Sequence, residues 1–232
     1  VGLKASKSTV NTSLQFLLTD PYYTFDGVAR TLNATISKTD VSSTSTSSYL
    51  SDTFSAGVMY DMPISETSTF GLGYDVSLTE FTTTIGSPII VTHHIADHGK
   101  TSLGITLKTN YISDTRNRTI FADTGIRNSL SGSIFLGLDG ASHLSMTHRT
   151  EFNRGHVLKT FGFDWNTVFQ LKTTIGIGAG LGSATSLPFY NKYYAGGNTT
   201  VRGYKGSSLG PLTYNASRTL AGSGAHSCSA KA

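Results

Sequence analysis

Apolar and polar side chains alternate along most of this chain, and this period of two constrains the fold more than any other feature. In residues 69–80 one phase carries Phe70, Leu72, Tyr74, Val76 and Leu78, and the other carries Gly71, Gly73, Asp75, Ser77 and Thr79. The longest such run covers residues 164–181. A side-chain period of two predicts strands with one apolar and one polar face.

The same alternation recurs between turn-forming segments. We expect about nine strands, near residues 1–8, 10–19, 28–39, 50–60, 69–80, 102–111, 126–137, 143–153 and 164–181. Four of their links carry Pro, Gly, Asp or Asn punctuation, and polar stretches such as 39–48 and 82–100 lie between those links. Helical periodicity is almost absent. The expected class is therefore all-β, with antiparallel strands.

Composition separates the two architectures that such strands can build. Only 14% of the residues are charged, against about 25% in ordinary soluble proteins. The polar phase is mostly Gly, Ser, Thr and Asn, where a soluble sandwich or barrel would place Lys and Glu. A membrane barrel turns its apolar face to lipid and its polar face to a lumen. The pattern favours an antiparallel transmembrane β-barrel, with the soluble sandwich left open.

Charge and cysteine content exclude other classes. The net charge is +4, but the basic residues are scattered, so we expect no nucleic-acid partner. The single cysteine, Cys228, cannot form an internal disulfide. No run of about 18 apolar residues occurs, so no transmembrane helix is expected. The chain begins at Val1 without a signal-like segment, which is expected of a processed protein or a fragment.

Three motifs could suggest chemistry. Residues 206–210 fit the Gly-x-Ser-x-Gly pattern around Ser208, but a nucleophile elbow needs a helix after the serine and Pro211 follows directly. The polar stretch 82–100 holds possible metal ligands, which we interpret as surface residues: His93, His94, Asp97 and His98. The glycines of 176–182 fit close packing in a strand rather than phosphate binding. We expect no catalytic residue, no metal and no cofactor.

Residues 187–211, LPFYNKYYAGGNTTVRGYKGSSLGP, carry a resemblance to a known family. An aromatic-Ala-Gly-Gly run, a polar spacer and a Val-Arg-Gly-aromatic run resemble the defining segment of the BamA-like family of outer-membrane assembly factors, surface antigens and two-partner secretion transporters. The matching residues are Tyr194, Ala195, Gly196 and Gly197, then Val201, Arg202, Gly203 and Tyr204.

Two further segments are similar to turns of the same family. TDPYYTFDGVA (19–29) resembles a turn between early barrel strands, on Asp20, Pro21, Tyr22, Asp26 and Gly27. DTRNRTIFADTG (114–125) resembles a second turn, on Asp114, Arg116, Asn117, Phe121 and Gly125, with Ala122 where the family usually has Pro. The resemblance implies that both are periplasmic turns.

The resemblance implies a barrel of about sixteen strands, within the even-numbered range of such proteins, whose sixth extracellular loop folds into the lumen. Arg202 would be a structural latch held by acidic residues of a later strand, since a buried guanidinium is costly unless paired. Gly203 would allow a tight turn, and Val201 and Tyr204 would pack on the inner wall. Residues 1–211 would then be a partial barrel of about nine strands, preceded by POTRA domains. Residues 212–232 would be a non-matching tail, artefactual or disordered.

By the same resemblance, the protein lies in the outer membrane of a Gram-negative bacterium and is not an enzyme. It would fold and insert other β-barrel proteins. Its partners would be outer-membrane lipid, unfolded client proteins and, through the POTRA domains, accessory lipoproteins. A two-partner secretion or TamA-like translocation barrel is one alternative, and a passive pore or adhesin barrel is another. An all-β hydrolase using Ser208 is a third.

Overall fold

The computed structural model describes residues 1–40, 49–84, 87–160, 163–182, 187–198, 200–205, 208–210, 213–214 and 228–229. Nine long strands account for most of them: β1 (Gly2–Lys7), β2 (Asn11–Asp20), β3 (Ala29–Asp40), β4 (Tyr49–Ser65), β5 (Ser68–Thr83), β6 (Thr101–Asp114), β7 (Thr124–Gly137), β8 (His143–Thr160) and β9 (Phe163–Gly180). The prediction of about nine strands is confirmed.

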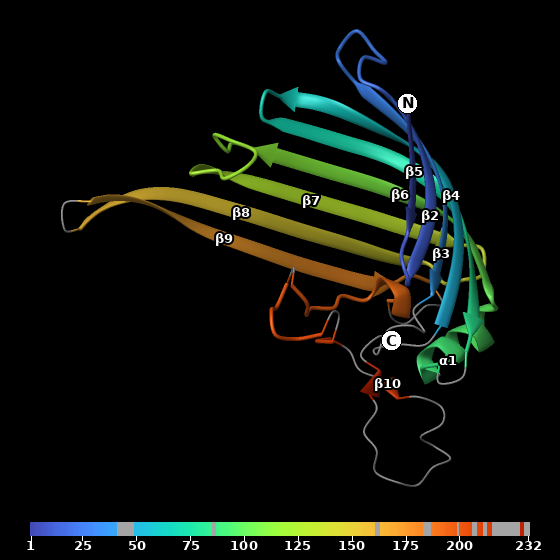
Figure 1. The fold of residues 1–232 in the computed structure, drawn as a ribbon. Helices are drawn as coiled ribbons and strands as arrows, with labels where there is room; N and C mark the ends of the chain where they lie inside the picture. The colour runs from blue at the N-terminus through green and yellow to red at the C-terminus, as the bar shows by residue number, and fades with distance from the viewer. Residues whose placement is uncertain are drawn as a thin grey trace.

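The nine strands form one curved antiparallel sheet in which each strand pairs with the next in sequence (Figure 1). The strands β2, β4, β6 and β8 end at one end of the sheet, the hairpin end. The strands β3, β5 and β7 end at the opposite end, the α1 end. β8 and β9 each have 18 residues, and their hairpin projects beyond its neighbours (Figure 1).

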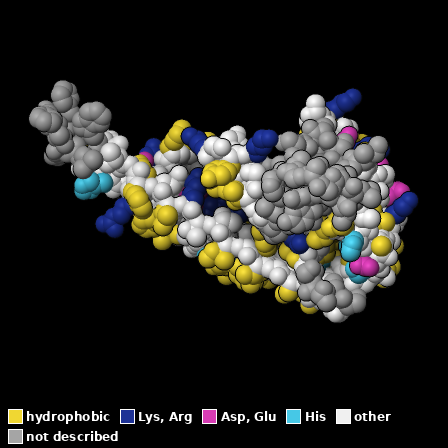
Figure 2. All heavy atoms as spheres, turned by 90° about the horizontal axis from the view of Figure 1, so that it is seen from below, with side chains coloured by type: hydrophobic (Ala, Val, Ile, Leu, Met, Phe, Trp, Pro, Cys, Tyr) yellow, Lys and Arg dark blue, Asp and Glu magenta, His cyan; other side chains and the backbone are white. Residues whose placement is uncertain are grey.

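The two faces of the sheet differ as the alternation predicts. Along β5, Leu72, Tyr74 and Val76 are 52%, 52% and 42% exposed, whereas Gly71, Gly73 and Asp75 between them are buried. In a single curved sheet the sheltered phase is the concave one. Hydrophobic side chains accordingly gather along the outer edge of the molecule in Figure 2. The apolar face is convex, and the Gly/Ser/Thr-rich face lines a hollow.

The stretch 82–100, interpreted from the sequence as a polar link, contains one helix. Helix α1 (Ile89–His98) begins after Pro88 and ends at Gly99, whose N–H donates to the carbonyl of Ile95 at 2.9 Å. Its apolar residues Val91 and Ile95 lie four positions apart and pack on the sheet, which a strand period could not reveal. In the part of the chain that the structure describes, no helix combines the length and the hydropathy of a membrane span.

An apolar cluster closes the concave face at the α1 end. Tyr49 of β4, Phe81 of β5, Val91 of α1 and Phe189 form it, and Phe189 belongs to a short 3₁₀ helix, η2 (Phe189–Asn191). Val91 is fully buried and Phe81 is 2% exposed. Segments far apart in sequence therefore meet here, and the chain after β9 returns onto the sheet.

Within the predicted tail 212–232, the described residues form one short pairing between β10 (Thr213–Tyr214) and β11 (Cys228–Ser229). The remainder of that tail lies outside the described residues. The domain boundary at residue 211 stays a prediction.

The two faces of β6 should respond differently to the same charge. Ile105→Lys places an ammonium on the convex face and should destabilise the intact protein in lipid vesicles by about 2–4 kcal/mol, as charged residues do near the bilayer midplane. Thr106→Lys is the matched control, because Thr106 is on the concave phase and faces Asp75 in register. Urea unfolding would measure both. Equal losses would contradict the assignment of the faces.

Candidate functional site: the glycine-arginine loop and the hairpin turns

The segment after β9 lies on the concave face of β8 and β9. The hydroxyl of Tyr193 donates to the carbonyls of Met146 and Ile177, each at 3.1 Å. Its ring lies where a side chain on Gly176 would be, and Leu187 occupies the corresponding space over Gly178. The alternating glycines of β9 therefore make room for this segment, in agreement with their interpretation as close-packing residues.

An aromatic cluster anchors the start of the loop. The rings of Phe189 and Tyr190 lie 5.4 Å and 5.2 Å from the ring of Phe81. His94 of α1 contacts the same group, with its ring 5.3 Å from Phe189 and 5.8 Å from Tyr190. Each such aromatic pair contributes about 0.5–1.5 kcal/mol beyond its buried area. Burial raises the pKa of Tyr190 to about 12.

The glycine-arginine loop itself (residues 194–210) closes on its own backbone. Ala195 and Leu209 exchange two hydrogen bonds of 2.7 Å and 2.9 Å, and the N–H of Gly197 donates to the carbonyl of Tyr204 at 3.0 Å. The positive φ values of Gly196 and Gly197, 113° and 96°, suit glycine alone. An added Cβ on Gly196 would also collide with the carbonyl of Lys205.

Arg202 lies at the tip of this loop. It is exposed, Gly203 beside it has φ 89°, and Val201 and Tyr204 are 36% and 56% exposed. Among the described residues no carboxylate forms an ion pair with Arg202. Its role as a latch therefore remains a prediction, as does the packing of Val201 and Tyr204 on the inner wall.

The first turn motif forms the hairpin between β2 and β3. The carboxylate of Asp20 accepts a hydrogen bond from the N–H of Tyr22 at 3.3 Å, and Gly27 turns the chain with φ 79°. Pro21, Tyr22 and Asp26 are exposed. The motif residues thus shape a solvent-facing turn.

The second turn motif, between β6 and β7, holds a buried arginine. The Arg116 side chain is only 6% exposed. It donates to both carboxylate oxygens of Asp114, at 2.9 Å and 2.8 Å, and to Glu151 of β8 at 3.2 Å. Two carboxylates therefore compensate one desolvated guanidinium, a geometry that arginine's planar fork allows.

The rest of that turn is held by hydrogen bonds from backbone N–H groups to Asn117 and by a close backbone approach at Gly125. The side-chain oxygen of Asn117 accepts from the N–H groups of Asp123 and Thr124 at 3.1 Å and 3.3 Å. Gly125 has φ 107°, and an added Cβ would collide with the carbonyl of Thr115. Phe121 has φ 54° and is 88% exposed, whereas Ala122 is buried. Asn117 and Gly125 thus shape the turn, and Phe121 projects from it.

The structure does not bring the three motifs together. Both turn motifs are at the hairpin end, and the anchor of the glycine-arginine loop is at the α1 end.

The residues considered for catalysis or metal binding do not form a site among the described residues either. The Ser208 hydroxyl donates to the carbonyl of Lys205 at 2.7 Å, and no three metal-binding side chains gather within the part of the chain that the structure describes. His94 and His98 are paired only as rings, 5.0 Å apart.

Two features of the site were absent from the sequence-based expectations. One is the anchor formed by Phe189, Tyr190 and His94, whose only sequence signal was the aromatic run before the Gly-Gly pair. The other is a charge row across four strands, in which register aligns Asp114, Arg127, Glu151 and Lys172. Charged residues on the concave phase of neighbouring strands were its signal, but only the register aligns them.

Comparison with known proteins agrees with this arrangement. The Omp85 superfamily domain matches residues 1–229. The chain belongs to the Omp85 superfamily. It is 30% identical over 222 residues to the outer membrane protein assembly factor BamA of Neisseria meningitidis serogroup B, covering 90% of this chain and 26% of that protein. The chain thus spans about a quarter of the length of this relative.

The fold is shared with a solved member of the superfamily. The crystal structure of BamA from Haemophilus ducreyi lacking POTRA domains 1–3 superposes with a TM-score of 0.79 at 21% identity, covering 91% of this chain and 41% of that one. Together with the superfamily match, this shared fold makes the described sheet part of an antiparallel β-barrel of the bacterial outer membrane. Its convex face meets lipid and its concave face lines the lumen.

Gly125 should tolerate no side chain. Gly125→Ala combines a left-handed φ with a backbone collision, so we expect the intact protein to lose about 1–3 kcal/mol. Gly132→Ala on the same strand is the control, because its added methyl meets only the Thr109 methyl, at 3.0 Å. Urea unfolding in vesicles would compare the two. Equal stability of both variants would contradict the backbone argument.

The anchor should loosen as the pH falls. Burial, and then the neighbouring His98, lower the pKa of His94 below 6.5. The imidazole of His94 binds a proton more readily when the segment is unfolded than when it is folded. The contribution of neutral His94 to the stability of the anchor is therefore complete above about pH 6.5. It is lost as the pH falls through the lower folded-state pKa. Amide exchange of α1, corrected for its intrinsic rate, should accelerate over that interval.

His94→Phe should remove this pH dependence, whereas His93→Gln, at an exposed neighbouring position, should retain it. Charges near the ring, from Asp97, His98 and Asp139, remain in both variants. A pH response that survives His94→Phe would assign the effect to another group.

Proposed function

We propose that this chain is part of an outer-membrane barrel that folds and inserts other β-barrel proteins into the bacterial outer membrane. The observation that carries the proposal is the Omp85 superfamily match over residues 1–229, joined to a closed glycine-arginine loop whose stem is anchored on the lumenal face. The Neisseria relative, named as an assembly factor, supports the same activity.

The proposed partners follow from the surfaces of the sheet. The convex face is apolar and fits the hydrocarbon of outer-membrane lipid. An unpaired strand edge is a template for another chain, and insertion of unfolded client barrels would use such an edge in the complete protein. Accessory lipoproteins would bind through domains outside this chain. Ser208 hydrogen-bonds only within its loop among the described contacts, and we propose no covalent chemistry.

Arg202 provides the test. In the intact protein, Arg202→Ala should remove the latch and reduce complementation of a depleted assembly factor by at least about tenfold, because an unpaired partner carboxylate left in the lumen costs several kcal/mol. Arg202→Lys should rescue only partly, since a point charge cannot replace a fork of donors. Lys205→Ala, three residues further along the loop, is the matched control.

The same assay separates the alternatives. A passive pore or adhesin barrel should tolerate Arg202→Ala, and its conductance or adhesion would remain while no client is inserted. A translocation barrel should secrete a partner protein but fail to restore client insertion. Normal complementation by Arg202→Ala at wild-type protein levels would rule out the latch.

A further inference from the structure

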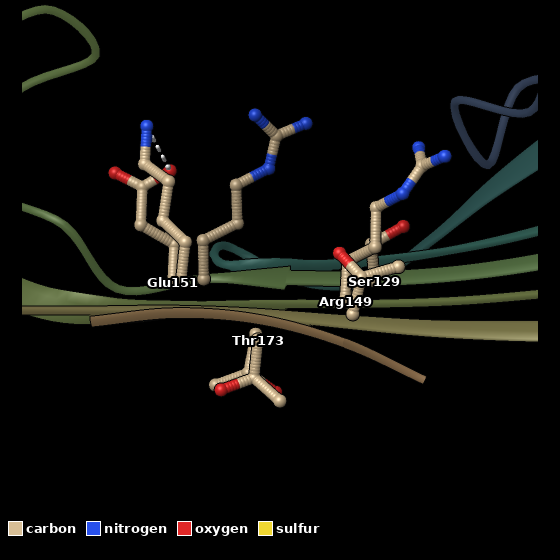
Figure 3. A pocket seen from close by; sticks show the side chains of 8 residues that line it. Ser129, Arg149, Glu151 and Thr173 are labelled. Atoms are coloured by element: carbon tan, nitrogen blue, oxygen red, sulfur yellow. Dashed lines mark ion pairs between the residues drawn. The ribbon is translucent and has the colours of Figure 1, made fainter. Parts of the chain in front are cut away.

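A cluster of cations lies on the lumenal face of β7, β8 and β9. Figure 3 shows Arg149 and Glu151 projecting from one side of the sheet, into a pocket, while Thr173 points to the other side. The pocket is also lined by Arg127, Ser129 and Lys172. It lies toward the hairpin end, where the register places Arg127 opposite Glu151 and Glu151 opposite Lys172.

The carboxylate in this pocket is already occupied. One oxygen of Glu151 accepts hydrogen bonds from Arg116 at 3.2 Å, Asn153 at 3.1 Å and Gln170 at 3.1 Å. Its other oxygen lies 3.9 Å from the ammonium of Lys172. Glu151 is therefore committed to the wall of the barrel and neutralises the remaining cations only weakly.

The other cations of the pocket can still pair with an added carboxylate. Arg149 lies between Ser129 and Thr174 in register, and no ion pair is formed by it among the described residues. The guanidinium of Arg127 lies 3.8 Å from Asp114 with 43% of its side chain exposed, and Lys172 is 65% exposed. Among the described residues, four cations including Arg116 thus face two carboxylates, Asp114 and Glu151, which leaves an excess of two positive charges.

We propose that Arg127, Arg149 and Lys172 bind the carboxylates of an acidic polypeptide segment in the lumen. Arg149 lies two residues along β8 from the row that holds Arg127 and Lys172, a separation of about 6.6 Å at the rise of a strand. Side chains at alternate positions of an extended segment have the same spacing. A guanidinium fork pairs with a carboxylate in two parallel hydrogen bonds.

The spacing of the two rows of cations also favours a polypeptide over a lone anion. A segment with acidic residues at every second position offers one carboxylate to each row of cations, whereas one phosphate presents its oxygens at a single point. The hydroxyls of Ser129 and Thr174, beside Arg149 in register, can hydrogen-bond the same carboxylate or the backbone of the segment. The site faces the lumen, away from the convex face that meets lipid.

The test is direct binding to the intact protein in detergent micelles or nanodiscs. The probe is a fluorescent seven-residue peptide with glutamate at alternate positions. The control peptide has glutamine at those positions. Fluorescence anisotropy should show saturable binding of the glutamate peptide and no binding of the glutamine peptide. The affinity for the glutamate peptide should fall as the salt concentration rises. Arg149→Gln and Lys172→Gln should each weaken it about threefold to fivefold, as expected for a partly exposed ion pair.

Arg154→Gln is the matched control, because Arg154 belongs to the same strand but to the opposite phase, and it should leave binding unchanged. Equal binding of the glutamine peptide, equal weakening by Arg154→Gln, or no binding at all would overturn the proposal. Displacement by millimolar inorganic phosphate with no salt-matched effect of chloride would instead assign the site to a small anion. Client insertion is measured separately, so this site and the insertion activity can fail independently.

Discussion

The cross-strand hydrogen-bond ladder is the constraint on which the rest of this structure depends. In hydrocarbon an unpaired N–H or C=O costs several kcal/mol, so a spanning strand must pair along its whole length. β3 through β9 meet this demand with long, nearly unbroken registers, such as the pairing of β8 with β9 from His143 opposite Gly180 to Thr160 opposite Phe163. Once the ladder is fixed, every side chain has only two directions, lipid or lumen.

The lumenal face also accommodates the segment that follows β9. Gly176 and Gly178 leave the inner wall of β9 bare, and Tyr193 and Leu187 fill the space. The segment that follows β9 can therefore lie against the wall, with the Tyr193 hydroxyl bonded to strand carbonyls. Packing of a loop inside the barrel depends on small residues in one strand as much as on the loop motif itself.

The sequence predicted the parts that follow from a period of two, and it missed those that depend on tertiary register. Nine strands and their faces could be read from alternation, because one residue of slip would turn Leu72 or Ile105 inward. Helix α1 was missed because Val91 and Ile95 form too short an apolar pattern within a polar stretch. The row from Asp114 to Lys172 was missed because it exists only after β6, β7, β8 and β9 are aligned. The turn glycines were found by family resemblance, and the structure supplies the reason in the φ of Gly125.

Two motif arginines illustrate what burial demands of a guanidinium. Arg116 is nearly inaccessible, and Asp114 and Glu151 together supply the acceptors that compensate its desolvation. Removing either carboxylate would leave a buried charge partly unpaired, which is more costly than losing the interaction itself. Arg202 is exposed at the tip of its loop, so the described chain imposes no such cost on it. An arginine becomes a latch only where its surroundings exclude water, and the same rule that explains Arg116 therefore sets the requirement for Arg202: acidic partners on a lumenal surface that encloses the loop tip.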